Sequence, residues 1–488
     1  MKAADLRHPG LSAGSVLAVV GVLVAVYTAV MPVARDGLQL MWLVPLSFAV
    51  CALAFSRIIG YHKGGVGLKI LYAVIVLRYV ALPALISATR GRLGPLMIRA
   101  SADGYRFATA VTIVELVVCC LTIGLAWPRV RRRHMTRSPA RTGGLGEGSD
   151  LTAGGLIIVV LLFVIILARG IDGVTSSFNF LMKTRRTVAT GVDSYAIVAL
   201  QVVKSFLFVV AATSCARKYE ATKKLPWVLT ATVVALLNVS TYFGYNRSQI
   251  LQTAIATTLT LVYLFPAFRR YVYLALVPVA GGVLFSLVAL KQFGVSAFGG
   301  GLAKKMTLDS LSQNLESYVN GPWPLATAYD AATAAARHVN GLTVLRTYTD
   351  NFFLFKVPGL SWPNDVLNGV PSVLDLYHAA TVPAQGAMLP LSGEMWFYGG
   401  QLLGPLLLLA GNVLAIYLLV YVDVRSTFAV GAHRRFFYYW MASLCGLIMC
   451  YDLITIWWSF SKFAFFLAIL FWLNNRPFWR LVRKPAPA

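Results

Sequence analysis

Long apolar stretches, separated by short polar segments, run through most of the chain. A transmembrane helix needs about 20 predominantly apolar residues, and the pattern predicts twelve such helices. They are expected at 11–33, 38–56, 67–87, 107–127, 152–168, 195–215, 226–243, 249–267, 271–290, 397–421, 436–457 and 463–475. The first stretch is longer than the hydrophobic region of a signal peptide, so we expect it to remain as a membrane anchor. The expected fold class is an all-α polytopic membrane protein.

The composition supports a membrane protein and excludes most other classes. Of the 488 residues, 58% are hydrophobic and 12% are charged. Soluble domains are about 45–50% apolar and about 25% charged, so this chain lacks the charged residues that a water-facing surface of its size requires. The six cysteines lie in or at the ends of apolar runs without C-x-x-C spacing, which favours buried thiols over a metal or redox site.

The net charge of +25 becomes informative about orientation once the basic residues are assigned to the two sides of the membrane. In a soluble protein such a charge would suggest nucleic-acid binding, but in a membrane protein the positive-inside rule explains it first, and no nucleic acid is expected as a partner. With a cytoplasmic N-terminus, every short inner segment is basic. An even number of helices then places the C-terminus in the cytoplasm too. The arginine-rich inner segment 128–151 is expected to lie against anionic lipid headgroups.

A segment of unusual length separates the ninth and tenth predicted helices. It divides the chain into residues 1–291 with helices 1–9, a large outer loop at 292–392, and residues 393–488 with helices 10–12 and a basic tail. The spacing of Met306, Leu308, Leu311, Leu315 and Tyr318 predicts a helix within 302–319, and the alanine-rich stretch 324–339 predicts a second. The remainder, rich in proline and glycine, predicts turns and short pieces. Leucine and aromatic residues suggest that the loop packs on the membrane surface.

Ionisable residues inside predicted spans are costly and therefore indicate function or specific pairing. Arg78 and Glu115 lie in neighbouring antiparallel helices, so they could pair, or Arg78 could face a substrate. Lys204 is expected to extend its ammonium toward the inner surface. Asp452, toward the outer end of the eleventh span, could line an outer cavity or partner an arginine.

Arginines are frequent where outer segments begin, and Arg247 is the strongest candidate among them. It lies in a very short hairpin between the seventh and eighth spans, with Asn246 and Ser248 beside it. A guanidinium binds phosphate through two parallel hydrogen bonds, and a helix start favours anions. The alternative is contact with a lipid headgroup. Other outer basic residues are Arg90, Arg92, Arg99, Arg169, Lys183, Arg185, Arg186, Arg337 and Arg346.

A carboxylate and several small residues precede the tenth span, in a motif that runs from Ser392 and Glu394 through Tyr398, Gly399 and Gly400 to Gly404. The pattern suits the wall of a pocket, and the alternative is plain capping of a helix start by Ser392 and Glu394. The chain contains no H-E-x-x-H, Walker A or G-x-G-x-x-G motif, which argues against a zinc protease or an ATPase. The lack of D-x-D in the first outer loop argues against metal-dependent transferases of lipid-phosphate sugars.

These features together resemble the O-antigen and oligosaccharide repeat-unit polymerases of bacterial cell envelopes, the Wzy family. The match consists of the twelve spans, the outer loop between the ninth and tenth, Asn246-Arg247-Ser248, and the motif from Glu394 through Tyr398 to Gly404. Some members carry R-x10-G motifs in two outer loops. The candidates Arg185, Arg186, Arg337 and Arg346 are not followed by glycine at that spacing, so no catalytic role is carried over to them from the family.

The resemblance implies glycan polymerisation at the outer face of the bacterial cytoplasmic membrane. The donor would be a growing chain on undecaprenyl diphosphate, and the acceptor a repeat unit on a second such lipid. A flippase and a chain-length regulator would be its protein partners, beside membrane lipids. An O-antigen ligase or another lipid-linked sugar transferase is an alternative. A transporter of lipid-linked glycan is a third, although it predicts a repeated half that the sequence lacks.

The residues themselves can support such a transfer. Positioned arginines would stabilise the leaving diphosphate, with Arg247 first and Arg78, Arg185, Arg186 and Arg337 as further candidates. The acceptor hydroxyl needs a general base, for which Glu394 and His338 are candidates. Arg346, Asn246 and Tyr398 are expected to contact the diphosphate or the glycan. Because cations can do a metal's electrostatic work, no metal and no other cofactor is expected.

Overall fold

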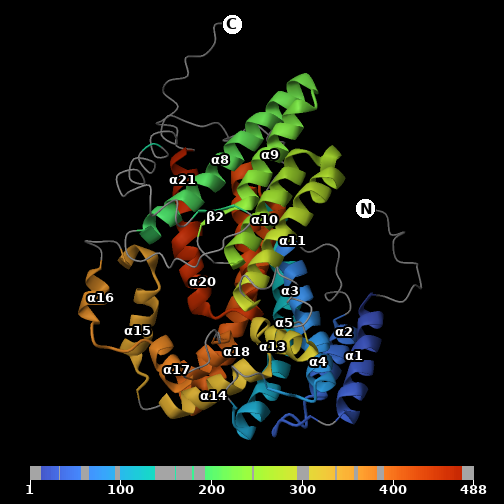
Figure 1. The fold of residues 1–488 in the computed structure, drawn as a ribbon, viewed down its shortest axis with the longest axis vertical. Coiled ribbons are helices and arrows are strands. Elements are labelled where there is room, and N and C mark those ends of the chain that lie inside the picture. Colours follow the sequence, from blue (N-terminus) through green and yellow to red (C-terminus); the bar gives the residue numbers. More distant parts are fainter. Residues whose placement is uncertain are drawn as a thin grey trace. The chain divides into compact units, whose positions relative to one another are not determined.

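The computed structural model describes residues 13–31, 33–55, 65–93, 99–137, 160, 178–180, 193–243, 247–293, 307–335, 338–356, 361–381 and 389–474. Within this part the chain is helical apart from one pair of three-residue strands (Figure 1). It divides into two compact units. The first contains residues 1–135, 305–424 and 445–457, and the second contains 136–304, 425–444 and 458–488.

Five described helices are long and apolar enough to cross a membrane: Val66–Ala88, Ala102–Met135, Val198–Thr222, Leu391–Phe428 and Leu453–Asn474. A bent pair, Gln249–Leu264 and Pro266–Gly282, meets at 117° and would count as a sixth if it forms one span. Gly14–Val30, Leu43–Ala54 and Pro226–Ser240 are apolar but shorter. The protein is therefore a helical membrane protein, as expected from the sequence. The number twelve and the assignment of inner and outer faces stay predictions, and most of the predicted span 152–168 lies outside the described residues.

The first unit begins with α1 (Ala13–Val30) and α2 (Leu43–Ala54), which pack on each other where Gly21 lies against Pro45 and Phe48. The next span is composite: α3 (Val66–Val76), a π-helical turn η1 (Leu77–Ala81) and α4 (Leu82–Ala88). Pro83 is the second residue after the π turn and has no N–H to donate, which interrupts the regular ladder of backbone hydrogen bonds there. The long helix α5 (Ala102–Arg137) completes this group.

The outer loop predicted at 292–392 is more helical than the sequence suggested. The two expected helices are confirmed as α13 (Leu308–Tyr318) and α14 (Pro322–Ala335). The stretch predicted to hold only turns and short pieces forms α15 (Gly341–Asp350), the 3-10 turn η4 (Phe353–Lys356), α16 (Trp362–Val366) and α17 (Val373–Thr381). Side-chain caps explain this: Asn340 caps α15 and Thr307 caps α13, each through a capping box with the third residue of its helix.

The helices of the predicted outer loop, α13 to α17, are called the outer helices below. Alanines of α14 allow them to pack closely on the start of α18 (Leu391–Phe428). Figure 1 shows α14, α17 and the start of α18 side by side. Their common core contains Ala328, Ala331, Ala332 and Ala335 from α14, Val373 and Tyr377 from α17, and Leu389 and Phe397. Aromatic rings extend this core to α5, because Phe107 lies 4.7 Å from Tyr329 and 4.5 Å from Trp396 between ring centroids. The outer helices are thus fixed to the spans of the first unit.

The C-terminal helices differ from the prediction of spans at 436–457 and 463–475. Helix α19 (Ala432–Gly446) ends early, a 3-10 turn η5 (Ile448–Cys450) follows, and a new helix starts at Leu453. It runs through α20 (Leu453–Ser459), a π turn η6 (Phe460–Ala464) and α21 (Phe465–Asn474). Two contacts explain the change. Gly446 approaches the Gly67 backbone, where a Cβ would meet the carbonyl at 2.7 Å, and Asp452 accepts a hydrogen bond from the Thr455 N–H at 2.6 Å.

The second unit contains α8 (Asp193–Thr222), α9 (Pro226–Ser240), α10 (Arg247–Leu264), the 3-10 turn η2 (Pro266–Phe268) and α11 (Arg269–Phe293). Strands β1 (Phe178–Phe180) and β2 (Thr241–Phe243) pair antiparallel, with Asn179 opposite Tyr242. The pair places Phe178–Phe180 beside Thr241–Phe243, which ends four positions before Arg247 in the sequence. The sequence analysis did not predict these strands.

Candidate functional site

An ion pair between Arg78 and Glu115 lies inside the first unit, as one of the two alternatives for these residues predicted. The Arg78 Nη2 and Glu115 Oε2 atoms are 2.6 Å apart, and the side chains are 1% and 4% exposed. Arg78 lies on the π turn η1, and its Nη1 also donates to the Met449 carbonyl at 3.5 Å. Because removing one partner of a buried pair leaves an uncompensated charge, these residues depend on each other.

The same polar network continues into the start of α18. Ser392 donates a hydrogen bond from its hydroxyl to Glu115 Oε1. Asn412, further along the helix, donates from Nδ2 to the Ser392 hydroxyl at 2.9 Å and to the Leu408 carbonyl at 2.9 Å. Ser392 therefore connects α18 to α5 through its side chain, and the alternative of plain helix capping by this residue is wrong.

Glu394 is fully buried and accepts three hydrogen bonds. Tyr398 donates at 2.5 Å and Tyr348 of α15 at 3.1 Å to Oε1, while the Leu453 N–H donates at 2.6 Å to Oε2. The carboxylate thus ties the starts of two candidate spans and one outer helix together. A general base must reach its proton, and in this arrangement donors occupy the Glu394 oxygens. The role of Glu394 as a general base stays a prediction. The expected contact of Tyr398 with the diphosphate or the glycan also stays a prediction, and its hydroxyl here donates to Glu394.

The glycines after Tyr398 interrupt the helical conformation of α18. Gly400 has φ 57° and ψ −155°, a conformation that is essentially confined to glycine. A Cβ on Gly399 would lie 2.4 Å from the Gly404 nitrogen, and one on Gly404 would lie 2.8 Å from the Trp396 ring. The break separates the short segment carrying Ser392 and Glu394 from the long apolar part of α18, so the two segments have different directions.

A second buried ion pair joins Arg35, between α1 and α2, to Glu316 of α13. Arg35 Nη1 lies 2.8 and 3.0 Å from the two carboxylate oxygens, and Nε donates to the Gly91 carbonyl at 2.6 Å. The Trp323 N–H donates to Glu316 Oε1 at 2.9 Å. Burial alone would lower the pKa of Arg35, but the Glu316 carboxylate outweighs it and the pKa is raised. This pair attaches α13 and the start of α14 to the spans.

Beside this pair is an open cavity of about 710 Å³. It is lined by the arginines Arg35, Arg92 and Arg99, the acidic residues Asp36 and Asp330, and Ala34, Gly91, Leu93, Ala100, Ser101, Ala102 and Tyr105. The side chains of Arg92 and Arg99 are 71% and 77% exposed. Asp330 accepts from the Ser101 N–H at 2.7 Å and from its hydroxyl at 2.5 Å, which fixes α14 to the start of α5.

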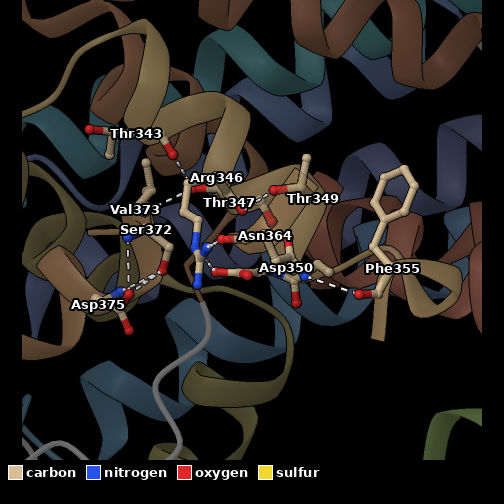
Figure 2. A network of polar contacts seen from close by, with 11 residues as sticks. Thr343, Arg346, Thr347, Thr349, Asp350, Phe355, Asn364, Ser372, Val373 and Asp375 are labelled. Carbon is tan, nitrogen blue, oxygen red and sulfur yellow. Dashed lines mark hydrogen bonds and ion pairs between the residues drawn. The ribbon is translucent and has the colours of Figure 1, made fainter. Parts of the chain in front are cut away.

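Arg346 is engaged within the outer helices. Figure 2 shows its guanidinium directed at Asp350 and Asn364. Nε lies 2.6 Å from Asp350 Oδ2, and Nη1 donates to the Asn364 carbonyl, so this side chain joins α15 to α16. The Arg346 and Asp350 side chains are 20% and 29% exposed. Two of the three guanidinium nitrogens of Arg346 that could bind a phosphate are thus already engaged with the protein.

The remaining predicted site residues are only partly described. His338 is exposed and lies three positions after the end of α14. It shares no hydrogen bond with Glu394 in the described part of the chain, and its carbonyl accepts from the Thr343 hydroxyl at 3.2 Å. Arg185, Arg186, Arg337 and Asn246 lie outside the described residues. Arg247 begins α10 by its backbone, and its side chain lies outside the description.

Two further charged residues of predicted spans have defined partners. Lys204 Nζ donates to the carbonyl of Asn238, in the last turn of α9, at 2.8 Å and to that of Thr241, which follows α9, at 2.5 Å. Carbonyls at the end of a helix have no partner within the helix, which explains why they attract this ammonium. Asp452 caps α20 through Thr455 and forms no ion pair with an arginine within the described ranges.

Sequence reasoning missed Arg35, Glu316, Tyr348 and the pair Ser101–Asp330. Two signals could have found the Arg35–Glu316 pair. Arg35 lies two residues after the first predicted span, and Glu316 lies outside the apolar stripe of its helix. Within the described residues, no group of three His, Cys, Asp or Glu side chains is placed to hold a metal ion.

Comparisons with known proteins do not identify a family. No protein-family model, no curated protein and no solved structure matches the chain. The arrangement itself offers exposed arginines, the Ser101 hydroxyl held by Asp330, and carboxylates around one cavity. Such a set can bind a polyhydroxylated, anionic ligand through charge-assisted hydrogen bonds.

Proposed function

We propose that this membrane protein polymerises oligosaccharide repeat units carried on undecaprenyl diphosphate, at the outer face of the bacterial cytoplasmic membrane. The observation that carries the proposal is the arginine-lined cavity between the span ends and the outer helices of the first unit. The resemblance of the sequence to repeat-unit polymerases adds the substrate class. A flippase that supplies the lipid-linked units and a chain-length regulator would be its partners.

In the proposed reaction, a hydroxyl oxygen of the acceptor sugar attacks the anomeric carbon of the donor. The bond between that carbon and the diphosphate oxygen breaks, undecaprenyl diphosphate leaves, and the hydroxyl proton passes to a base. Charge develops on the leaving oxygen, and preorganised cations stabilise it. Arg92 and Arg99 are suited to this role because both are exposed to the cavity. Arg247 remains the other predicted diphosphate ligand.

Glu316 lies behind the cavity wall, where it holds Arg35, which lines the cavity. Glu394 is not among the lining residues and holds Tyr348 against the span starts. Of the carboxylates in this part of the molecule, Asp36 and Asp330 line the cavity itself. They are therefore further candidates for the base, beside Glu394 and His338.

The test uses purified full-length protein in detergent with lipid-diphosphate-linked repeat units, EDTA and no nucleotide. We expect a ladder of lengthened glycans on the lipid. Products that never exceed one repeat unit would refute polymerisation, and transfer only to an added lipid A core acceptor would indicate a ligase instead.

Matched variants test the cavity. Arg92→Ala and Arg99→Ala should each slow chain elongation, because each removes a cation that faces the proposed diphosphate site. Arg106→Ala is the control: this arginine is 67% exposed on α5, pairs with Asp103, and does not line the cavity. If Arg92→Ala and Arg99→Ala elongate glycans as fast as the Arg106→Ala control at equal protein level, the cavity is not the site.

A further inference from the structure

Helix α15 has its polar and apolar faces reversed relative to an ordinary packed helix. Thr343 and Thr347 lie one turn apart on one face, which packs on the protein, and both are fully buried. Leu342 and Leu345 face outward, with 54% and 51% of their surfaces exposed. A helix of a soluble surface buries its apolar stripe and exposes its polar one. The reversed arrangement indicates that the medium outside α15 is apolar.

Helix α16 continues this apolar surface. Trp362 and Val366 are one turn apart and are 66% and 75% exposed. Arg346 fixes the two helices together by reaching from α15 to the Asn364 carbonyl between these residues (Figure 2). Leu342, Leu345, Trp362 and Val366 form what we call the α15–α16 apolar face. Contiguous exposed apolar groups on two joined helices mark a contact surface.

The position of α15 relative to the spans identifies the medium. Tyr348 donates to Glu394, which lies in the first turn of the candidate span Leu391–Phe428. The carbonyl of Tyr348 accepts from the Trp457 indole at 3.2 Å, and Phe352 stacks on the Trp457 ring with centroids 5.1 Å apart. Trp457 is one turn inside the candidate span Leu453–Asn474, about 6 Å along its axis. Helix α15 is therefore held at the depth where two spans enter the membrane.

We infer that the α15–α16 apolar face inserts into the lipid bilayer, at the boundary between headgroups and acyl chains. Short amphipathic helices bind this boundary about 5–10 Å deep. Tryptophan is enriched there, which fits Trp362, and the exposed Lys356 at the end of η4 can reach the phosphates. The inference concerns a contact with phospholipid and does not depend on the proposed function.

The test places a fluorophore on this face in full-length protein reconstituted into phospholipid nanodiscs. Leu345→Cys and Val366→Cys, labelled with an environment-sensitive dye, are compared with Thr333→Cys on the exposed side of α14. The six native cysteines are buried, so the unlabelled parent gives the background. We expect blue-shifted emission at 345 and 366, quenching by spin-labelled phospholipid, and loss of quenching by iodide. The dye at 333 should show the opposite behaviour.

Two results would overturn the inference. Iodide quenching at 345 and 366 as strong as at 333 would mean that the face lies in water. Protection of both positions from iodide and from spin-labelled lipid would mean that protein covers the face, either another part of this chain or a partner. Two independent positions are used so that a local disturbance at one of them cannot decide the outcome.

Discussion

Replacing Glu316 with alanine should loosen α13 and the start of α14 from the spans without unfolding the spans themselves. The substitution leaves the buried guanidinium of Arg35 with backbone acceptors only, and it also removes the acceptor of the Trp323 N–H. Breaking a buried ion pair by removing one partner costs about 3–5 kcal/mol. At about 1.4 kcal/mol per factor of ten, local opening of α13 should become more frequent by roughly a hundredfold to a few thousandfold.

The size of the effect can be separated into its parts. Glu316→Gln keeps an oxygen for the Trp323 N–H but loses the charge, so we expect a smaller cost of about 1.5–3 kcal/mol. The double variant Arg35→Met with Glu316→Leu removes both charges, and should be far closer to the parent than Glu316→Ala, because a buried pair can be replaced by apolar groups at little cost.

Hydrogen exchange of peptides from α13 and α14, measured in nanodiscs, reports this opening directly. Arg99→Ala is the control, because its ion pair with Asp36 is 77% and 72% exposed and such pairs contribute about 1 kcal/mol or less. Exchange in Glu316→Ala no faster than in Arg99→Ala would refute the reasoning. The reasoning would also be refuted if the free-energy cost of the double variant equalled the sum of the costs of Arg35→Met and Glu316→Leu measured separately.

Three further predictions concern thermal stability of the purified protein. Gly400→Ala forces a side chain into a glycine-only conformation and should cost about 1–3 kcal/mol. Gly281→Ala should cause no loss, because a Cβ added there meets nothing within 4 Å, and equal melting temperatures of the two variants would contradict the strain at Gly400. Asp423→Ala removes the carboxylate that caps α3 and should cost about 1–2 kcal/mol, with Asn partly restoring it. Lys204→Met should lower the melting temperature more than Lys218→Met, since only Lys204 binds the last carbonyls of α9; the reverse order would disprove this cap.

The sequence predicted features that depend on local pattern. Apolar length predicted a helical membrane protein, the alanine-rich stretch predicted α14, and the positions of Arg78 and Glu115 in adjacent helices allowed their pairing. These predictions succeeded because the period of a helix and the cost of a lone buried charge act over short distances along the chain.

Features that depend on distant contacts could not be predicted. Whether the chain continues as helix through residue 446 depends on the Gly67 backbone, which a Cβ there would strike. Lys204 lies among apolar neighbours in sequence, and only the fold shows that the end of α9 is beside it. The environment of Glu394 is set by Tyr348 and Leu453, and neither is adjacent in sequence. For such residues the sequence reveals a polar group in an apolar setting but not its partner.

The long-range ion pair also sets an order of assembly during synthesis. Glu115 follows Arg78 within roughly 2–7 s at ordinary translation rates, so this pair can close early. Glu316 is 281 residues beyond Arg35 and emerges about 14–56 s after it. The interval is longer still for α3, because Asp423, whose carboxylate caps this helix, is 358 residues beyond Gly65. Arg35 therefore lacks its Glu316 partner, and α3 lacks its Asp423 cap, until most of the chain has been translated.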